Sequence, residues 1–132
     1  VTWGNLVLFV KRFTDSFLEP TSIKCQITDN TAESHSLFID AFTRRRLYLA
    51  IKEMVNNTVK YADATLIEIV FDYKDNVLHV SVSDNGKGFD LEHMQGGNGV
   101  STIKKVIQDI PKSKVEVISN HQGTRYKIEI AK

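Results

Sequence analysis

The strongest constraint on the fold comes from residues 77–88, where an alternating strand pattern runs into a turn with the sequence DNGKG (84–88). Apolar side chains occupy every second position of the strand, and the same period places Asp84 on its buried face. A carboxylate that faces the interior is costly unless hydrogen-bond donors surround it. The glycines that follow, Gly86 and Gly88, let backbone come close to a ligand. Asp-Asn-Gly is also a common hairpin turn, but this combination favours the floor of a binding pocket.

The rest of the chain supplies helical and alternating patterns in a simple order. The predicted helices cover 3–18, 39–62 and 100–110, and the predicted strands cover 23–28, 66–73, 77–83, 114–118 and 125–130. These elements favour an α/β (α+β) two-layer sandwich, in which a mixed, mainly antiparallel sheet of about five strands packs against three helices. No linker, repeat or low-complexity segment interrupts the pattern, so residues 1–132 are expected to form one domain.

Charge and cysteine content exclude several classes of protein. The chain has 17 basic and 16 acidic residues, which gives no basic field for nucleic acid or for an anionic membrane. Cys25 is the only cysteine, so an internal disulfide framework and a cysteine-based zinc site are excluded, and a reducing, cytoplasmic location is expected. No apolar run approaches membrane-spanning length. Because the chain begins with Val1, we expect it to be the C-terminal part of a longer protein, whose inner-membrane anchoring stays open.

A polar stripe follows the longest predicted helix, 39–62. Glu53, Asn57 and Lys60 are spaced i, i+4 and i+7, so at about 100° per residue they align within about 40°. They are expected along the border of the buried face. An asparagine carbonyl is a hard oxygen ligand, and Mg²⁺ commonly takes few protein ligands while it keeps phosphates and waters. The stripe favours a magnesium and phosphate site, although an exposed helix edge with an ordinary ion pair fits the same residues.

A glycine-rich segment, GGNG (96–99), opens the third predicted helix. Glycines before a helix N-terminus expose backbone N–H groups and the positive end of the helix dipole to an anion. Glycine-rich loops are common, so this segment is a weak indication by itself. The preceding residues, 90–95, are polar and have no period.

Three segments together carry a family resemblance. EMVNNTVKYA (53–62), DNGKGF (84–89) and GNGV (97–100) resemble, in this order and spacing, the N, G1 and G2 boxes of the GHKL ATPases. Within that superfamily, the chain is similar to the ATP-binding catalytic domain of two-component sensor histidine kinases, in the branch of the nitrate and desaturase sensors. The resemblance extends over nearly the whole chain and implies a Bergerat-type ATP-binding fold.

The resemblance implies an adenine site built around Asp84. This carboxylate would accept a hydrogen bond from the adenine amino group, and Gly88 would allow the base to approach. Gly86 and Phe89 belong to the same box and would contribute to nucleotide binding. Thr124 matches the threonine of a Gly-Thr pair that lies near the adenine in this family.

The resemblance also implies a phosphate and metal site. Asn57 would ligate Mg²⁺, Glu53 would polarise a water or the attacking group, and Lys60 would meet phosphate oxygens. Residues 90–95 would form a mobile lid. The residues that would cradle the phosphates or line the nucleotide are Gly97, Asn98, Gly99 and Val100.

The implied reaction transfers the γ-phosphoryl group of ATP to a histidine, through positioning and charge neutralisation. The phosphoacceptor is expected elsewhere, because none of the four histidines lies on a helix in an acceptor-motif context: His35, His79, His93 and His121. The dimerisation and phosphoacceptor helices would precede this domain in a parent kinase that signals to a response regulator. The fragment is expected to be a monomer and the parent a homodimer, with no nucleic acid and no direct membrane contact.

The chain departs from the family pattern at three places. Tyr61 replaces the usual histidine beside Lys60, Asn98 stands where histidine is frequent, and IPK (110–112) replaces a common glycine-containing turn. These departures leave nucleotide affinity and lid behaviour open.

Two other functions stay open at the level of sequence. One is a stand-alone GHKL kinase of the anti-sigma-factor type, which phosphorylates a serine of its partner. The other is a nucleotide-binding or interaction module without catalytic activity, against which the presence of Glu53, Asn57 and Asp84 argues.

Overall fold

The computed structural model describes residues 2–88 and 99–132. Within them, the strands are β1 (Lys24–Asp29), β2 (Leu66–Lys74), β3 (Val77–Asp84), β4 (Ser113–Asn120) and β5 (Gly123–Ala131). The helices are α1 (Trp3–Leu18), α2 (Ala41–Asn57) and α3 (Gly99–Gln108), with a 3-10 turn, η1 (Ala32–Ser34), and a π-helical turn, η2 (Thr58–Ala62).

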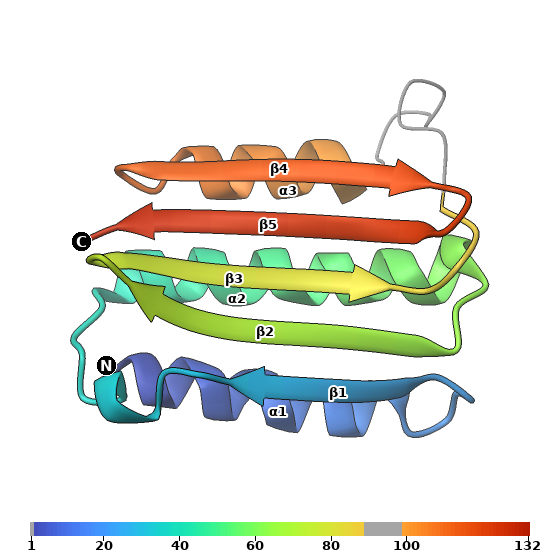
Figure 1. The fold of residues 1–132 in the computed structure, drawn as a ribbon, viewed down its shortest axis with the longest axis horizontal. Coiled ribbons are helices and arrows are strands. Elements are labelled where there is room, and N and C mark those ends of the chain that lie inside the picture. Colours follow the sequence, from blue (N-terminus) through green and yellow to red (C-terminus); the bar gives the residue numbers. More distant parts are fainter. Residues whose placement is uncertain (1, 89–98) are drawn as a thin grey trace.

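The five strands form one mixed sheet in the order β1-β2-β3-β5-β4 (Figure 1). β1 pairs with β2 in parallel, and the other three pairings are antiparallel. The parallel pair requires a crossover, which α2 supplies, whereas β2–β3 and β4–β5 are hairpins. The expected mixed, mainly antiparallel sheet is confirmed.

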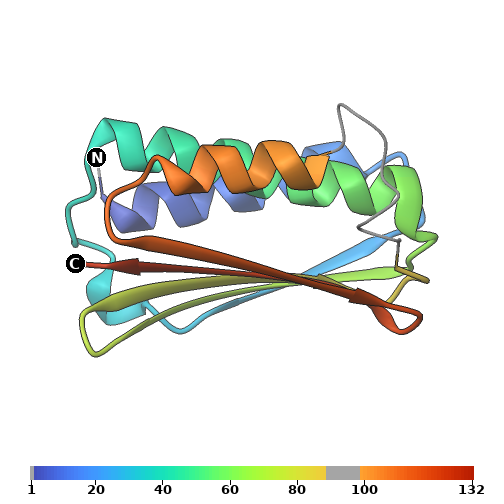
Figure 2. The same ribbon diagram turned by 90° about the horizontal axis from the view of Figure 1, so that it is seen from above.

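All three helices lie on one face of the sheet, so the molecule has two layers (Figure 2). The core fills the space between the layers, where alternate strand residues such as Ile69, Val80 and Ile128 meet the apolar faces of the helices. The opposite sheet face carries the outward half of each alternating strand. The predicted two-layer α/β sandwich is therefore confirmed. No helix in the described ranges is long and apolar enough to cross a bilayer.

Local capping signals fix where the first two helices begin. Thr2 and Asn5 form a capping box at the start of α1, which has the bounds predicted from its periodicity. Asp40 caps α2 by accepting a hydrogen bond from the Thr43 N–H at 2.7 Å. The predicted helix over 39–62 is found as α2 followed by η2, because its last turn widens from α to π geometry. Asp63 ends it in the left-handed conformation, with φ of 56°.

The β2–β3 turn is found where the sequence predicts it, whereas β4 and β5 extend beyond their predicted ends. Asp75 and Asn76, between β2 and β3, both have positive φ, as a tight hairpin with the right twist requires. The last hairpin is longer than predicted, since β4 and β5 leave only His121 and Gln122 between them. Thr124 consequently lies within β5, paired with Ser119, and not at the beginning of the hairpin turn.

Candidate functional site

Asp84 ends β3 on the face that points toward the helices. Its Oδ1 atom accepts hydrogen bonds from the backbone N–H of Gly86 at 2.9 Å and of Thr124 at 3.3 Å. Its Oδ2 atom accepts one from the hydroxyl of Thr58 at 2.9 Å. An ionised carboxylate has about four acceptor positions, so these three bonds fix its orientation and leave room for one further donor. The side chain thereby joins β3, β5 and η2 at one end of the sheet.

The segment after Asp84 is held against the loop that leads into β2. Asn85 accepts hydrogen bonds from the N–H groups of Thr65 and Leu66 at 2.9 and 3.0 Å. The Lys87 N–H donates to the carbonyl of Ala62 at 2.7 Å. The turn predicted as a pocket floor is thus anchored on both sides, to η2 and to the start of β2.

Gly86 and Gly88 are required by the protein's own backbone. A Cβ atom on Gly86 would lie 2.1 Å from the Ala62 carbonyl oxygen. Gly88 has φ of +71°, and its Cβ would lie 2.0 Å from the Asn120 carbonyl oxygen. Both glycines admit close packing of the loop against η2 and β4. Their predicted role toward a nucleotide stays a prediction.

Asn57, the last residue of α2, lies deeper than the border position expected from its spacing. Its side chain belongs to the core with 1% exposure, while Glu53 is partly buried and Lys60 is exposed. Lys60 lies in the π turn, where the α-helical 100° spacing used to align the stripe no longer holds. The three side chains therefore differ in depth: Asn57 lies in the core, Glu53 at its border and Lys60 in solvent.

Tyr126 explains how an asparagine can be buried there, and sequence reasoning missed it. It lies on β5, is 1% exposed, and its hydroxyl accepts a hydrogen bond from Asn57 Nδ2 at 3.3 Å. Burial raises the pKa of Tyr126 to about 12; the Asn57 hydrogen bond lowers it, while the Asp84 and Glu53 carboxylates raise it further. The available signal was the alternation of β5, which puts the Tyr126 hydroxyl on the same buried face as Thr124, Ile128 and Ile130.

Thr124 adds a second polar pair at the same end of the sheet. It is 2% exposed, and its hydroxyl lies 2.8 Å from that of Ser119 on β4. Its backbone N–H bonds to Asp84, so the structure brings together these two residues, which the resemblance placed near the adenine.

The remaining predicted positions are divided between described and undescribed parts of the chain. Gly99 begins α3, and Val100 is 7% exposed and belongs to the core cluster. The other predicted residues lie outside the described residues: Phe89, Gly97, Asn98 and the segment 90–95.

The oxygen donors at this end of the sheet fit the groups that the resemblance implies. With its Nδ2 atom held by Tyr126, the Asn57 amide offers its carbonyl oxygen as a hard ligand suited to Mg²⁺. The Asp84 carboxylate suits an amine donor, as adenine provides. Within residues 2–88 and 99–132, no group of three His, Cys, Asp or Glu side chains is arranged to hold a metal.

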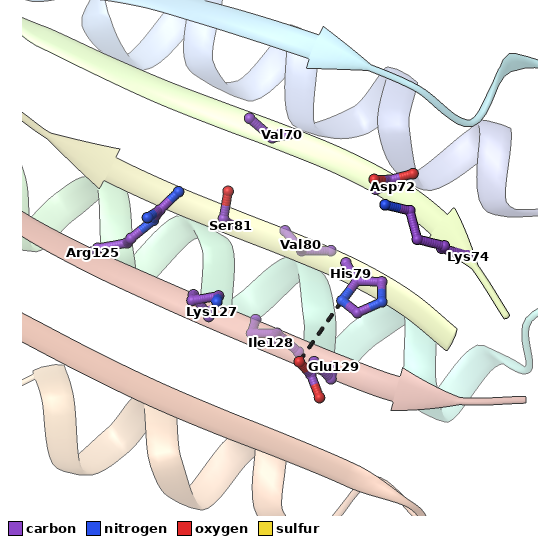
Figure 3. A pocket seen from close by; sticks show the side chains of 10 residues that line it. All are labelled: Val70, Asp72, Lys74, His79, Val80, Ser81, Arg125, Lys127, Ile128 and Glu129. Atoms are coloured by element: carbon purple, nitrogen blue, oxygen red, sulfur yellow. Dashed lines mark ion pairs between the residues drawn. The ribbon is translucent and has the colours of Figure 1, made fainter. Parts of the chain in front are cut away.

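A separate hollow of about 220 Å³ lies on the open face of the sheet, over β2, β3 and β5 (Figure 3). His79 and Glu129 form an ion pair across it at 3.8 Å when the histidine is protonated, and Arg125 and Lys127 line its other end. The ten side chains labelled there include none of the predicted site residues. His79 lies on the face opposite Asp84, as the strand period predicts.

Comparison with known proteins agrees with this geometry. Residues 42–132 match the family model described as "Histidine kinase-, DNA gyrase B-, and HSP90-like ATPase". The catalytic domain of histidine kinase ThkA, in a nucleotide-free form, superposes with a TM-score of 0.78 at 20% identity and covers 100% of this chain and 94% of that one. The histidine kinase domain of the Erythrobacter litoralis EL346 blue-light activated kinase gives a TM-score of 0.78 at 18% identity, over 95% and 64%.

Curated relatives include kinases of two kinds. Sensor histidine kinase YdfH of Bacillus subtilis is 35% identical over 79 residues, which are 59% of this chain and 18% of that protein. Serine-protein kinase RsbW of Bacillus cereus is 34% identical over 68 residues, 49% of this chain and 42% of that protein. The chain thus spans less than half the length of either relative.

The nitrate and desaturase branch stays a prediction. With the family model matched over 42–132 and the catalytic-domain fold present throughout, the chain belongs to the histidine kinase-, DNA gyrase B- and HSP90-like ATPases.

Proposed function

We propose that this chain is the ATP-binding catalytic domain of a sensor histidine kinase, that it forms one domain over residues 1–132, and that it acts in the cytoplasm, where ATP is available. It binds Mg-ATP and passes the γ-phosphoryl group to a histidine on a separate dimerisation and phosphoacceptor domain. The observation that carries the proposal is Asp84, whose carboxylate is oriented by Gly86, Thr58 and Thr124 with room for one more donor.

Each residue then has a defined task. Asp84 accepts a hydrogen bond from the adenine amino group, which selects adenine over a base with a carbonyl at that position. Lys60, exposed beyond the end of α2, binds phosphate oxygens. When bound, Mg²⁺ neutralises charge on the phosphates. Asn57 holds this ion through its amide oxygen, and Glu53 orients the attacking group. Gly97 and Gly99 contribute backbone N–H groups to the phosphates.

The reaction breaks the bond between the γ-phosphorus and the bridging oxygen of ATP and forms a bond to an imidazole nitrogen, so ADP leaves. The acceptor histidine and the dimerising helices belong to a parent homodimer, which signals to a response regulator, while this fragment alone is a monomer. The side chains of this domain position the nucleotide and neutralise the charge on its phosphates, and none of them forms a covalent intermediate.

A serine kinase is the second candidate, because RsbW is 34% identical over 68 residues. The two functions differ in the product. A phosphohistidine is lost in acid and survives in base, whereas a phosphoserine survives in acid. A third possibility, a module that binds nucleotide without transfer, would show ATP binding and no phosphorylated product of either kind.

The proposed site is tested by titrating the chain with ATP by calorimetry, as wild type and as Asp84→Asn. An asparagine can keep the Gly86 and Thr124 hydrogen bonds through its oxygen, so the fold should survive. Its NH₂ group, however, cannot accept from the adenine amine. Loss of a hydrogen bond to a charged group weakens binding about ten- to a hundredfold.

Asp72→Asn is the matched control, since Asp72 lies on the open face of β2 and its carboxylate accepts a hydrogen bond from the Tyr73 N–H at 2.9 Å. It should bind ATP like wild type. Equal affinity of all three proteins would contradict the adenine role of Asp84, and no binding by wild type would contradict the proposed function as a whole.

A further inference from the structure

We infer that Tyr126 is a positioning residue for Asn57: its hydroxyl holds the amide so that the carbonyl oxygen, and not the NH₂ group, is offered to the metal ion of the bound nucleotide. The inference rests on the function proposed above. It adds to that site a residue that none of the three sequence boxes contains.

The contact joins two layers of the fold at their buried boundary. Asn57 ends α2 and Tyr126 lies on β5, 69 residues later, yet Nδ2 and Oη are 3.3 Å apart. Both side chains are 1% exposed. Because water cannot replace a lost partner in such a place, the Asn57 NH₂ group depends on the tyrosine hydroxyl.

In the structure, the NH₂ end of the Asn57 amide is the end that meets the Tyr126 hydroxyl. An asparagine side chain has a donor end and an acceptor end, and these exchange places when it rotates by half a turn. With Nδ2 held at Oη of Tyr126, the Oδ1 atom takes the opposite place. Without the hydroxyl, the NH₂ group loses this acceptor and the amide is free to rotate; an outward NH₂ group would repel a cation in place of binding it.

The test is calorimetric titration of the full chain with ATP, once with excess Mg²⁺ and once with EDTA, for wild type and Tyr126→Phe. Phenylalanine keeps the ring in the core and removes only the hydroxyl. The affinity in EDTA should stay within about twofold of wild type. The gain in affinity on adding Mg²⁺ should fall about three- to tenfold, the usual value of one hydrogen bond.

Tyr73→Phe is the matched control. The Tyr73 hydroxyl also makes one side-chain hydrogen bond of 3.3 Å, to Asn76 at the β2–β3 turn, at the other end of the sheet. This variant should keep the full Mg²⁺ gain. Tyr126→Phe should add no further loss of Mg²⁺ gain in an Asn57→Ala background, where no amide remains to be positioned.

An independent readout needs no nucleotide. In NMR spectra of the free chain, the Asn57 side-chain NH₂ signals, identified by their loss in Asn57→Ala, should exchange slowly with solvent in wild type and faster in Tyr126→Phe.

Three outcomes separate the inference from the proposed function. Reduced Mg²⁺ gain in Tyr126→Phe with unchanged affinity in EDTA supports the inference. An unchanged gain, even with a lowered melting temperature, shows a merely structural tyrosine and overturns the inference alone. Failure of wild type to bind ATP overturns the proposed function and the inference with it.

Discussion

At the end of the sheet that carries Asp84, polar side chains in or beside the core form hydrogen-bonded pairs, and each pair joins two different elements of the fold. Thr58 of η2 donates to Asp84 of β3, and Asn57 of α2 donates to Tyr126 of β5. An unpaired polar group in such a position costs about 1–3 kcal/mol, so the pairs hold the side chains in one arrangement before any ligand arrives.

The sequence predicted Asp84 and Asn57 as site residues but not the contacts that hold them: Thr58 lies in the segment 53–62 without any sign of its bond to Asp84, and Tyr126 lies in none of the three segments. Asp84 and Asn57 were identified because they fall in short segments with a recognisable order. Their partners lie 26 and 69 residues away, and no local pattern connects them. Tyr126 looks in the sequence like any aromatic core residue of a strand, because its partner is brought to it only by packing of α2 on the sheet.

We predict that Asn57→Asp alters the metal dependence of ATP binding more than the selectivity for the adenine base. A carboxylate at position 57 changes the charge on the metal ligand and removes the donor to Tyr126, while Asp84 stays intact. The Mg²⁺ concentration that gives half-maximal enhancement of ATP binding should therefore shift. The preference for ATP over GTP should persist. Calorimetry across a series of Mg²⁺ concentrations measures both.

Asn56→Asp is the control for charge, because the neighbouring Asn56 is partly exposed and introduces the same group one position away. It should leave the Mg²⁺ midpoint close to that of wild type. An unchanged midpoint in Asn57→Asp would show that Asn57 is not the ligand.

The element that sets the geometry of the site is α2 with its π turn. Periodicity predicted its extent within two residues at the beginning and its end at Ala62. Periodicity could not predict the change to π geometry, because a widened turn follows from tertiary contacts. In this turn Thr58 reaches Asp84, and the Ala62 carbonyl receives the Lys87 N–H. The depth of Asn57 was misjudged for a related reason, because Tyr126 of β5 meets it only in the folded chain.

The beginning of α2 supports a prediction about stability. The Asp40 side chain accepts from the Thr43 N–H at 2.7 Å, and this bond is the main cause that lowers the pKa of Asp40 below its ordinary value of 3.8. Removing an N-cap side chain costs about 1 kcal/mol. Asp40→Ala should therefore lower the free energy of unfolding by about 1 kcal/mol at pH 7, measured by urea denaturation.

The effect should depend on pH with a defined sign. Because the pKa is lower in the folded state, the charge of Asp40 stabilises the fold above pH 3.8, and this stabilisation is lost as the pH falls through the folded value. The difference between wild type and Asp40→Ala should shrink in that range. Asp40→Asn, which keeps a capping oxygen, should be nearly as stable as wild type at pH 7. An equal loss in both variants would contradict the capping role.

Across the whole molecule, the matched family segment begins at residue 42, yet residues 2–38 belong to the same core. β1 completes the sheet beside β2, and α1 covers it (Figures 1 and 2). The sequence predicted these elements but not their places, because parallel pairing across a long connection leaves no turn signal of the kind that marks a hairpin. The integration of this N-terminal part favours one cooperative domain.

Trp3, the only tryptophan, allows that single domain to be tested. It is 0% exposed, its indole N–H donates to Thr31 at 2.7 Å, and its ring meets Phe71 of β2 edge to face at 5.7 Å. Its fluorescence therefore reports whether α1 stays packed on the sheet, whereas far-ultraviolet circular dichroism reports all helices and strands. In urea at equilibrium the two signals should change at the same midpoint, as expected for a cooperative two-state transition. A fluorescence change at clearly lower urea would show that α1 detaches first, and residues 42–132 would then form the stable unit by themselves.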